Sequence, residues 1–173
     1  MIVVRKGVFE TNSSSTHSIC IAKTNKINIP EKITVNLHNY EFGWEEDKRS
    51  STEEKIAYIV IAMLNYCNFD IAVDRIKRLI TCIRNFGVKS LEISGIEIHS
   101  YGSVSEPYFD TWDGYVDHGN ELEDFVKTIL ENDDLLKEYL FNKDSFILTG
   151  NDNNDSDINI NVDYEHEEFF KGN

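Results

Sequence analysis

The chain has 173 residues, of which 40% are hydrophobic and 28% are charged, and its formal net charge at pH 7 is −14. These fractions are typical of a globular protein and exclude a fibrous or low-complexity chain, and the length suits one domain. The longest apolar run, Ile56–Leu64, is far shorter than the roughly 20 residues that span a bilayer. Because Met1–Lys6 also lacks a signal-peptide pattern, we expect a cytoplasmic protein with no membrane contact.

The acidic charge is concentrated in the second half of the chain. Residues 1–86 carry 12 basic and 10 acidic side chains, whereas residues 87–173 carry 5 basic and 21 acidic ones, a net of −16. Nucleic-acid binding depends on basic side chains that neutralise phosphates. The composition therefore argues against direct DNA or RNA binding and suits either a solvated face or a partner with a basic surface.

A polar run, Glu10–Ser18, separates two apolar segments, Met1–Phe9 and Ile19–Ala22. Ser, Thr and Asn side chains bond nearby backbone groups and favour turns. The run is either a self-satisfied turn between two strands or a cradle for an anion such as phosphate. In the cradle, His17 would act as an acid, a base or a metal ligand. The candidate ligand-binding residues of this run are Glu10, Asn12, Ser13, Ser14, Ser15 and His17.

Strand alternation after the polar run places His17 on the same face as Ile19 and Ile21. The pattern therefore also allows a buried structural histidine. Lys32–Asn36 and Tyr40–Trp44 are predicted strands, and Glu45–Ser50 is predicted to be a charged loop.

Two helices are predicted next. Ser51-Thr52-Glu53-Glu54 is a capping-box pattern, and the apolar residues that follow surround the helix, which predicts a central helix ending near Cys67. Asp70 is expected to cap a second helix that ends at Gly87. The exposed side of this helix is expected to be basic, with Arg75, Lys77, Arg78 and Arg84. Three alternatives are open for what these residues contact: phosphates, the protein's own acidic half, or water.

The second half begins with strand-like segments Val88–Ser94 and Ile96–Ser100, joined at Gly95 as a hairpin or a bulge. The long segment Tyr101–Gly119 has no clear periodicity, as is common for functional loops, and it contains the candidate residues Asp117 and His118. A third helix is expected after Asn120.

A fourth helix is expected from Asn132 or Asp133, followed by a strand at Ser145–Thr149. The Asn/Asp-rich segment Gly150–Asp157 contains the candidates Asn151 and Asp152 but lacks the Gly and Glu of a calcium loop. Ile158–Val162 alternates as a final strand. We therefore expect a single α+β domain over residues 1–163, with about four helices on a largely antiparallel sheet of about six strands, and an acidic tail over 164–173.

The cysteines do not predict a metal site, because Cys20, Cys67 and Cys82 form no Cys-x-x-Cys pair. Cys67 and Cys82 fall on apolar helix positions, where we expect both to be buried. No nucleotide-binding glycine loop occurs, so we expect no cofactor.

The segment Arg5–Ser18 resembles the opening of a family of phage and Gram-positive bacterial proteins. The segments Gly114–His118, Leu140–Phe141 and Thr149–Asn153 also resemble that family. The resemblance implies a phage or mobile-element context, with the host cytoplasm as the compartment, and it implies no particular reaction.

Two hypotheses of function remain. The first is a phage accessory protein without catalytic activity that uses its acidic surface to bind a host protein with a basic surface, for example to block a defence system. The second is a nucleotide- or phosphate-binding protein or a small metal-assisted hydrolase, with a phosphorylated ligand at Glu10–Ser18, Asp117, His118, Asn151 and Asp152. In the hydrolase, His17, Asp117, His118 and Asp152 would hold a metal if their strands were neighbours in one sheet.

Overall fold

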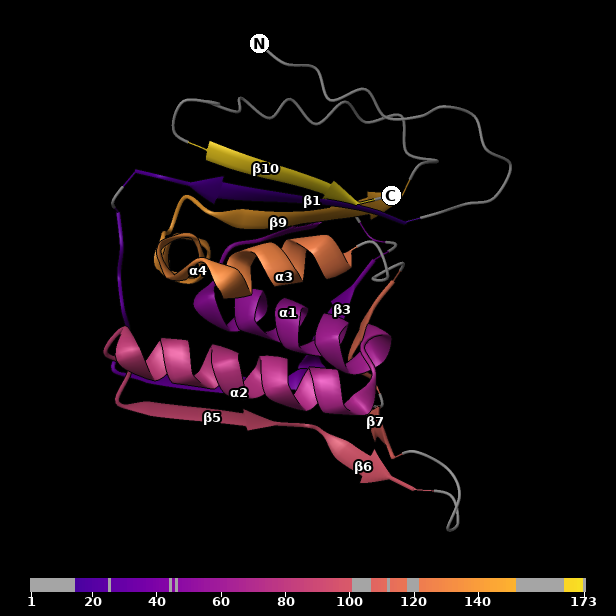
Figure 1. Ribbon diagram of the computed structural model, residues 1–173. Helices are drawn as coiled ribbons and strands as arrows, with labels where there is room; N and C mark the ends of the chain where they lie inside the picture. The colour runs from indigo at the N-terminus through magenta and orange to yellow at the C-terminus, as the bar shows by residue number, and fades with distance from the viewer. Residues whose placement is uncertain are drawn as a thin grey trace.

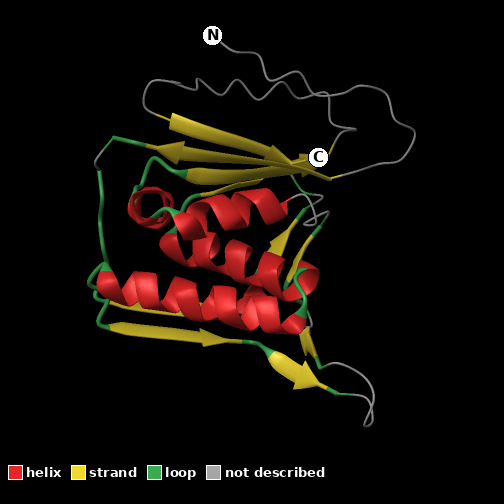
Figure 2. Cartoon of the chain, in the orientation of Figure 1, coloured by secondary structure: helices red, strands yellow, loops and turns green. Residues whose placement is uncertain are grey.

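A computed structural model gives the protein an α+β architecture with its helices between layers of strands (Figure 1). Figure 2 shows the helices, in red, in the middle of the molecule and strands, in yellow, above and below them. The structure describes residues 15–24, 26–43, 45, 47–100, 107–111, 113–117, 122–151 and 167–172.

A four-stranded antiparallel sheet covers one side of the helices, in the order β10-β1-β9-β4. β1 (Ser15–Ala22) lies between β9 (Phe146–Asn151) and β10 (Glu167–Gly172), and β4 (Asp47–Arg49) forms the other edge. Two of these strands differ from the sequence-based expectation, since β4 lies in the expected loop 45–50 and β10 lies in the expected tail 164–173.

The two unexpected strands are edge strands, whose sequences are commonly charged. In β4, the Lys48 ammonium lies 4.0 Å from the centre of the Phe146 ring, so a charged side chain covers an apolar one. In β10, the backbone of Phe169 and Phe170 is in register with Cys20 and Ile19 of β1. Both strands are held by partners far away in the sequence, and local patterns do not record such partners.

The remaining strands form three two-stranded sheets rather than extending the first one. β2 (Lys32–Asn36) pairs in parallel with β5 (Ser90–Ser94), and β3 (Glu41–Phe42) pairs in parallel with β8 (Tyr115–Val116). β6 (Glu97–His99) pairs antiparallel with β7 (Tyr108–Asp110). The strands therefore form four small sheets, whereas the sequence predicted one sheet of about six strands. Parallel pairing requires a long crossover, which the two helices between β2 and β5 supply.

The four helices are α1 (Thr52–Tyr66), α2 (Phe69–Asn85), α3 (Glu123–Glu131) and α4 (Asp133–Phe141). The capping box of Ser51 and Glu54 is confirmed. α2 begins two residues earlier than expected, because Asn68 rather than Asp70 occupies the N-cap position, and Gly87 beyond its end has φ 113°. Asn132 caps α4 by accepting a hydrogen bond from the Leu135 N–H. The expected cap of α3, Asn120, lies outside the described residues.

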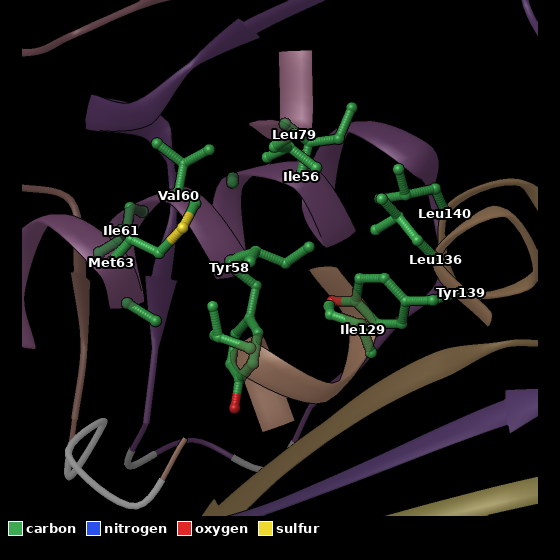
Figure 3. Close-up of a cluster of buried hydrophobic side chains, with 14 of the residues drawn as sticks. Ile56, Tyr58, Val60, Ile61, Met63, Leu79, Ile129, Leu136, Tyr139 and Leu140 are labelled. Atoms are coloured by element: carbon green, nitrogen blue, oxygen red, sulfur yellow. The ribbon is translucent and has the colours of Figure 1, made fainter. Parts of the chain in front are cut away.

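Helix α1 is the centre of the core, as its apolar surface predicts. Ten consecutive residues, Lys55–Leu64, are buried. Figure 3 shows Ile56 and Tyr58 of α1 together with Leu79 of α2, Ile129 of α3 and Tyr139 of α4. Of the two cysteines expected in this core, Cys82 is fully buried, whereas Cys67 at the end of α1 is only half-buried. Within the described ranges, none of the helices has both the length and the apolar character needed to cross a bilayer.

Candidate functional site

The polar N-terminal run is described only from its last residues. The candidates Glu10, Asn12, Ser13, Ser14, His118 and Asp152 lie outside the described residues. Ser15 begins β1, and its backbone is in register with Asn151 at the end of β9. The structure therefore brings together two candidates that are far apart in the sequence, at one end of the two central strands of the sheet.

His17 faces the core, on the side of β1 that also carries Ile19 and Ile21. Its side chain is only 1% exposed, and its ring lies 5.8 Å from the ring of Tyr58 in α1. Tyr58 is completely buried, and burial raises the pKa of its hydroxyl well above the usual value. Within the described part of the chain this hydroxyl has no hydrogen-bond partner. The burial expected for a structural histidine is therefore observed at His17.

Asp117 lies on a different sheet from His17. It follows β8, and its N–H donates a hydrogen bond of 2.8 Å to the Phe42 carbonyl of β3. The ring of Phe42 contacts the ring of Tyr58 at 5.0 Å, so Tyr58 packs against both Phe42 and His17. Of the strands that the metal hypothesis requires as neighbours, β1 with His17 pairs with β9, which ends just before Asp152 in the sequence, whereas Asp117 follows a strand of another sheet.

The outer face of the β3–β8 pair carries a set of acidic residues around one aromatic ring. Glu41 and Tyr115 are register partners and both are exposed, whereas Phe42 and Val116 occupy the buried inner face. Residues 37–45 and 107–117 contain no Lys or Arg. We call this outer face, together with the acidic residues that flank the two strands in the sequence, the acidic ribbon, and its members are Glu41, Glu45, Asp113, Tyr115 and Asp117.

The negative charge of the acidic ribbon affects the pKa of Tyr115. Partial burial raises the pKa of its hydroxyl, and the negative charges of Glu41, Asp117 and Glu45 raise it further. Over the residues that the structure describes, Glu41, Glu45 and Asp113 form no ion pair. These three side chains therefore present their carboxylates to solvent rather than to internal cations. Asp117 was a candidate from the sequence and the other members were not, although residues 37–45 and 107–117, which contain no Lys or Arg, were a usable signal.

Two of the four basic residues on the exposed side of α2 contact the protein's own acidic half, one of the alternatives that the sequence left open, whereas Lys77 pairs with Asp74 of α2 itself and Arg84 is exposed. Arg75 pairs with Glu123 of α3 at 3.3 Å, and Arg78 pairs with Asp133 at the start of α4. Arg78 Nε also donates to the Leu130 carbonyl at 3.3 Å. A groove of about 460 Å³ lies between α2 and α3, but both guanidinium groups that line it are already engaged.

The structure also contains a buried polar cluster at the junction of β1, α1 and α4, which the sequence did not predict. The Lys55 ammonium donates to the carbonyl oxygens of Asn142 and Ser145, at 3.0 and 3.3 Å. The Asn142 amide donates to the Ala22 carbonyl at 2.9 Å. Lys55 is 1% exposed, and burial lowers its pKa to about 8. This cluster ties elements together and has no access to solvent, so it is structural.

No group of three or more His, Cys, Asp or Glu side chains among the described residues is arranged to hold a metal ion. No protein-family model matches the chain, and neither a curated protein nor a solved structure shows significant similarity to it.

Proposed function

We propose that this protein is a phage or prophage accessory protein that acts without catalysis, by binding a host macromolecule through its acidic surface. The partner is a protein with a basic surface, such as the nucleic-acid-binding cleft of a defence protein. Electrostatic complementarity of this kind accelerates association and selects the partner.

The distribution of ion pairs is the observation that supports this proposal. Two of the three arginines of α2, Arg75 and Arg78, are paired with Glu123 and Asp133 of the same chain. Three carboxylates of the acidic ribbon, those of Glu41, Glu45 and Asp113, form no such ion pair in the described residues. Two basic side chains of α2 therefore neutralise acidic residues at α3 and α4, and the carboxylates of Glu41, Glu45 and Asp113 are left for an external cation.

The test is capture of host proteins by the immobilised full-length protein at two salt concentrations. A specific partner should be retained at about 50 mM salt and largely lost at about 200 mM, because exposed charge pairs are screened. Each retained protein is then purified, and its complex is challenged with double-stranded DNA. DNA should displace this protein from a nucleic-acid-binding cleft. Binding that is insensitive to both salt and DNA would contradict the proposal.

A second candidate function, binding of a nucleotide or phosphate with or without metal-assisted hydrolysis, is supported by the register of Ser15 and Asn151. The site would lie where β1 begins and β9 ends, at Ser15 and Asn151. A thermal-shift panel of mononucleotides and divalent metals tests it, since a ligand at about 100 times its Kd stabilises by roughly 2.7 kcal/mol. A stabilisation abolished by Asn151→Ala would support this function, and a flat panel would count against it.

A further inference from the structure

The acidic ribbon combines an exposed aromatic ring with carboxylates on both of its strands. Tyr115 is 41% exposed, and its register partner on the neighbouring strand is Glu41. Adjacent strands lie about 4.8 Å apart, so the Glu41 side chain emerges beside the Tyr115 ring. Asp117 directly follows β8, and the position that a Cβ on Gly43 would occupy is close to both the Tyr115 ring and the Asp117 side chain, so Asp117 lies on the same side as Tyr115.

The backbone under this face is fixed by close contacts. The Tyr66 hydroxyl at the end of α1 donates to the Val116 carbonyl of β8 at 2.6 Å. A Cβ atom on Gly43 would lie 2.7 Å from the Cβ of Asp117, so glycine allows the two chain segments to approach. The face is therefore held in place before any partner arrives, which reduces the entropy lost on binding.

We propose that the outer face of the β3–β8 pair is the docking surface for an arginine-bearing segment of the partner protein. The proposal rests on the proposed function and deepens it. The guanidinium group stacks on the Tyr115 ring and donates hydrogen bonds to the flanking carboxylates of Glu41 and Asp117. Glu45 and Asp113 extend the negative charge toward the neighbouring basic residues of the partner.

Arginine fits this face better than lysine for two physical reasons. Its planar guanidinium group stacks on an aromatic face and is weakly hydrated, whereas the compact ammonium of lysine keeps its water. Its fork of N–H donors also matches a carboxylate in a bidentate manner. The same negative charge repels phosphates, so a nucleic acid does not fit this face.

Binding of oligo-arginine and oligo-lysine peptides of equal length to the full-length protein tests the proposal. The amide signals of isotopically labelled protein locate the binding site by NMR, and a titration gives each Kd. We expect the shifted signals to cluster at Glu41, Gly43, Tyr115 and Asp117. The arginine peptide should bind about fivefold more tightly than the lysine peptide, the range of a cation–π contact at an exposed site.

Variants with matched charge separate this face from the general acidity of the protein. Glu41→Lys with Glu45→Lys should weaken arginine-peptide binding about tenfold or more. The control double variant, Asp124→Lys with Glu131→Lys, makes the same change of net charge at exposed positions of α3 and should have less than about a threefold effect. Tyr115→Ala should abolish the preference for arginine, and Tyr115→Phe should keep it because the ring remains.

The outcomes distinguish this proposal from the proposed function. Equal weakening by the two double variants, or shifts centred on α3 and α4, would overturn the docking surface while leaving an acidic binding protein. Failure of both peptides to bind at low salt would contradict the proposed function itself. Because Glu41, Glu45 and Tyr115 are all exposed, the variants are expected to fold, and an unchanged melting temperature verifies it.

Discussion

Asn142 and Ala22 are joined by a hydrogen bond of 2.9 Å from the side-chain amide of one to the backbone carbonyl of the other. The bond connects the end of α4 to the end of β1, although the residues are 120 positions apart in the chain. The Asn142 backbone carbonyl accepts a further bond from the Lys55 ammonium of α1. One fully buried asparagine therefore joins three elements of the fold.

Replacing Asn142 should destabilise the protein strongly. Asn142→Ala leaves the buried Ala22 carbonyl without the bond from the amide, and a buried polar group that loses its partner costs about 1–3 kcal/mol. We expect a loss near the upper end of that range in the free energy of unfolding by urea. Asn65→Ala, at an exposed position of α1, is the matched control and should change stability by less than about 0.5 kcal/mol. Equal losses in the two variants would show that the amide is not structurally important.

Lys55 should make stability rise with pH in the alkaline range. Burial lowers its pKa in the folded state from 10.5 to about 8, so between these values the unfolded chain binds more protons than the native chain. The free energy of unfolding then increases as the pH rises from about 8, and the full change approaches about 3 kcal/mol above pH 10.5. Below pH 8 both states are protonated, and this group adds no pH dependence.

The comparison with Lys55→Met isolates this contribution. Other groups that titrate in the same range are common to both proteins and cancel in the difference. We expect the stability of the wild-type protein relative to Lys55→Met to increase by about 2 kcal/mol between pH 8 and pH 10, measured by urea unfolding at each pH. A difference that stays constant over this range would mean that the ammonium titrates near its ordinary value.

Gly95 should tolerate a side chain less well than Gly87, although both have positive φ. Their φ angles are 82° and 113°, and left-handed backbone costs a non-glycine residue about 1–2 kcal/mol. A Cβ on Gly95 would also lie 2.8 Å from Asn36 Oδ1 and 2.8 Å from the His38 ring, whereas a Cβ on Gly87 would meet nothing within 4 Å. Gly95→Ala should therefore cost at least about 1 kcal/mol more than Gly87→Ala in thermal or urea unfolding. The opposite order would contradict the close packing of β5 against the turn after β2.

Local sequence patterns, which involve only residues close together in the chain, were sufficient to predict much of the fold. The Ser51 and Glu54 capping box, the apolar run after it and Gly87 beyond α2 all act through neighbours in the sequence. The bounds of β2, Lys32–Asn36, were predicted for the same reason. Alternation in β1 placed His17 on the same face as Ile19 and Ile21, although residues 17–22 are buried on both faces of the strand.

Pairing between distant segments was not predictable, because alternation identifies a strand but not its partner. β5 and β6 were expected to be joined at Gly95 as a hairpin or a bulge, but β5 pairs in parallel with β2 and β6 pairs with β7. The acidic ribbon depends on the pairing of β3 with β8, and the polar cluster depends on contacts of Asn142 with Ala22. Neither arrangement has a local pattern, so the features of the candidate site emerged only from the three-dimensional structure.

The N-terminal cap of α1 should be a measurable source of stability. The Ser51 hydroxyl oxygen accepts from the Glu54 N–H at 3.2 Å, and the Glu54 carboxylate accepts from the N–H groups of Ser50 and Ser51 at 3.0 and 2.9 Å. Ser51→Ala removes the capping hydroxyl and should lower the free energy of unfolding by about 1 kcal/mol. Ser50→Ala keeps the backbone N–H that bonds Glu54, so this neighbouring control should change stability by less than about 0.5 kcal/mol. Similar losses in both variants would show that the Ser51 hydroxyl contributes nothing beyond a general effect of serine at the start of the helix.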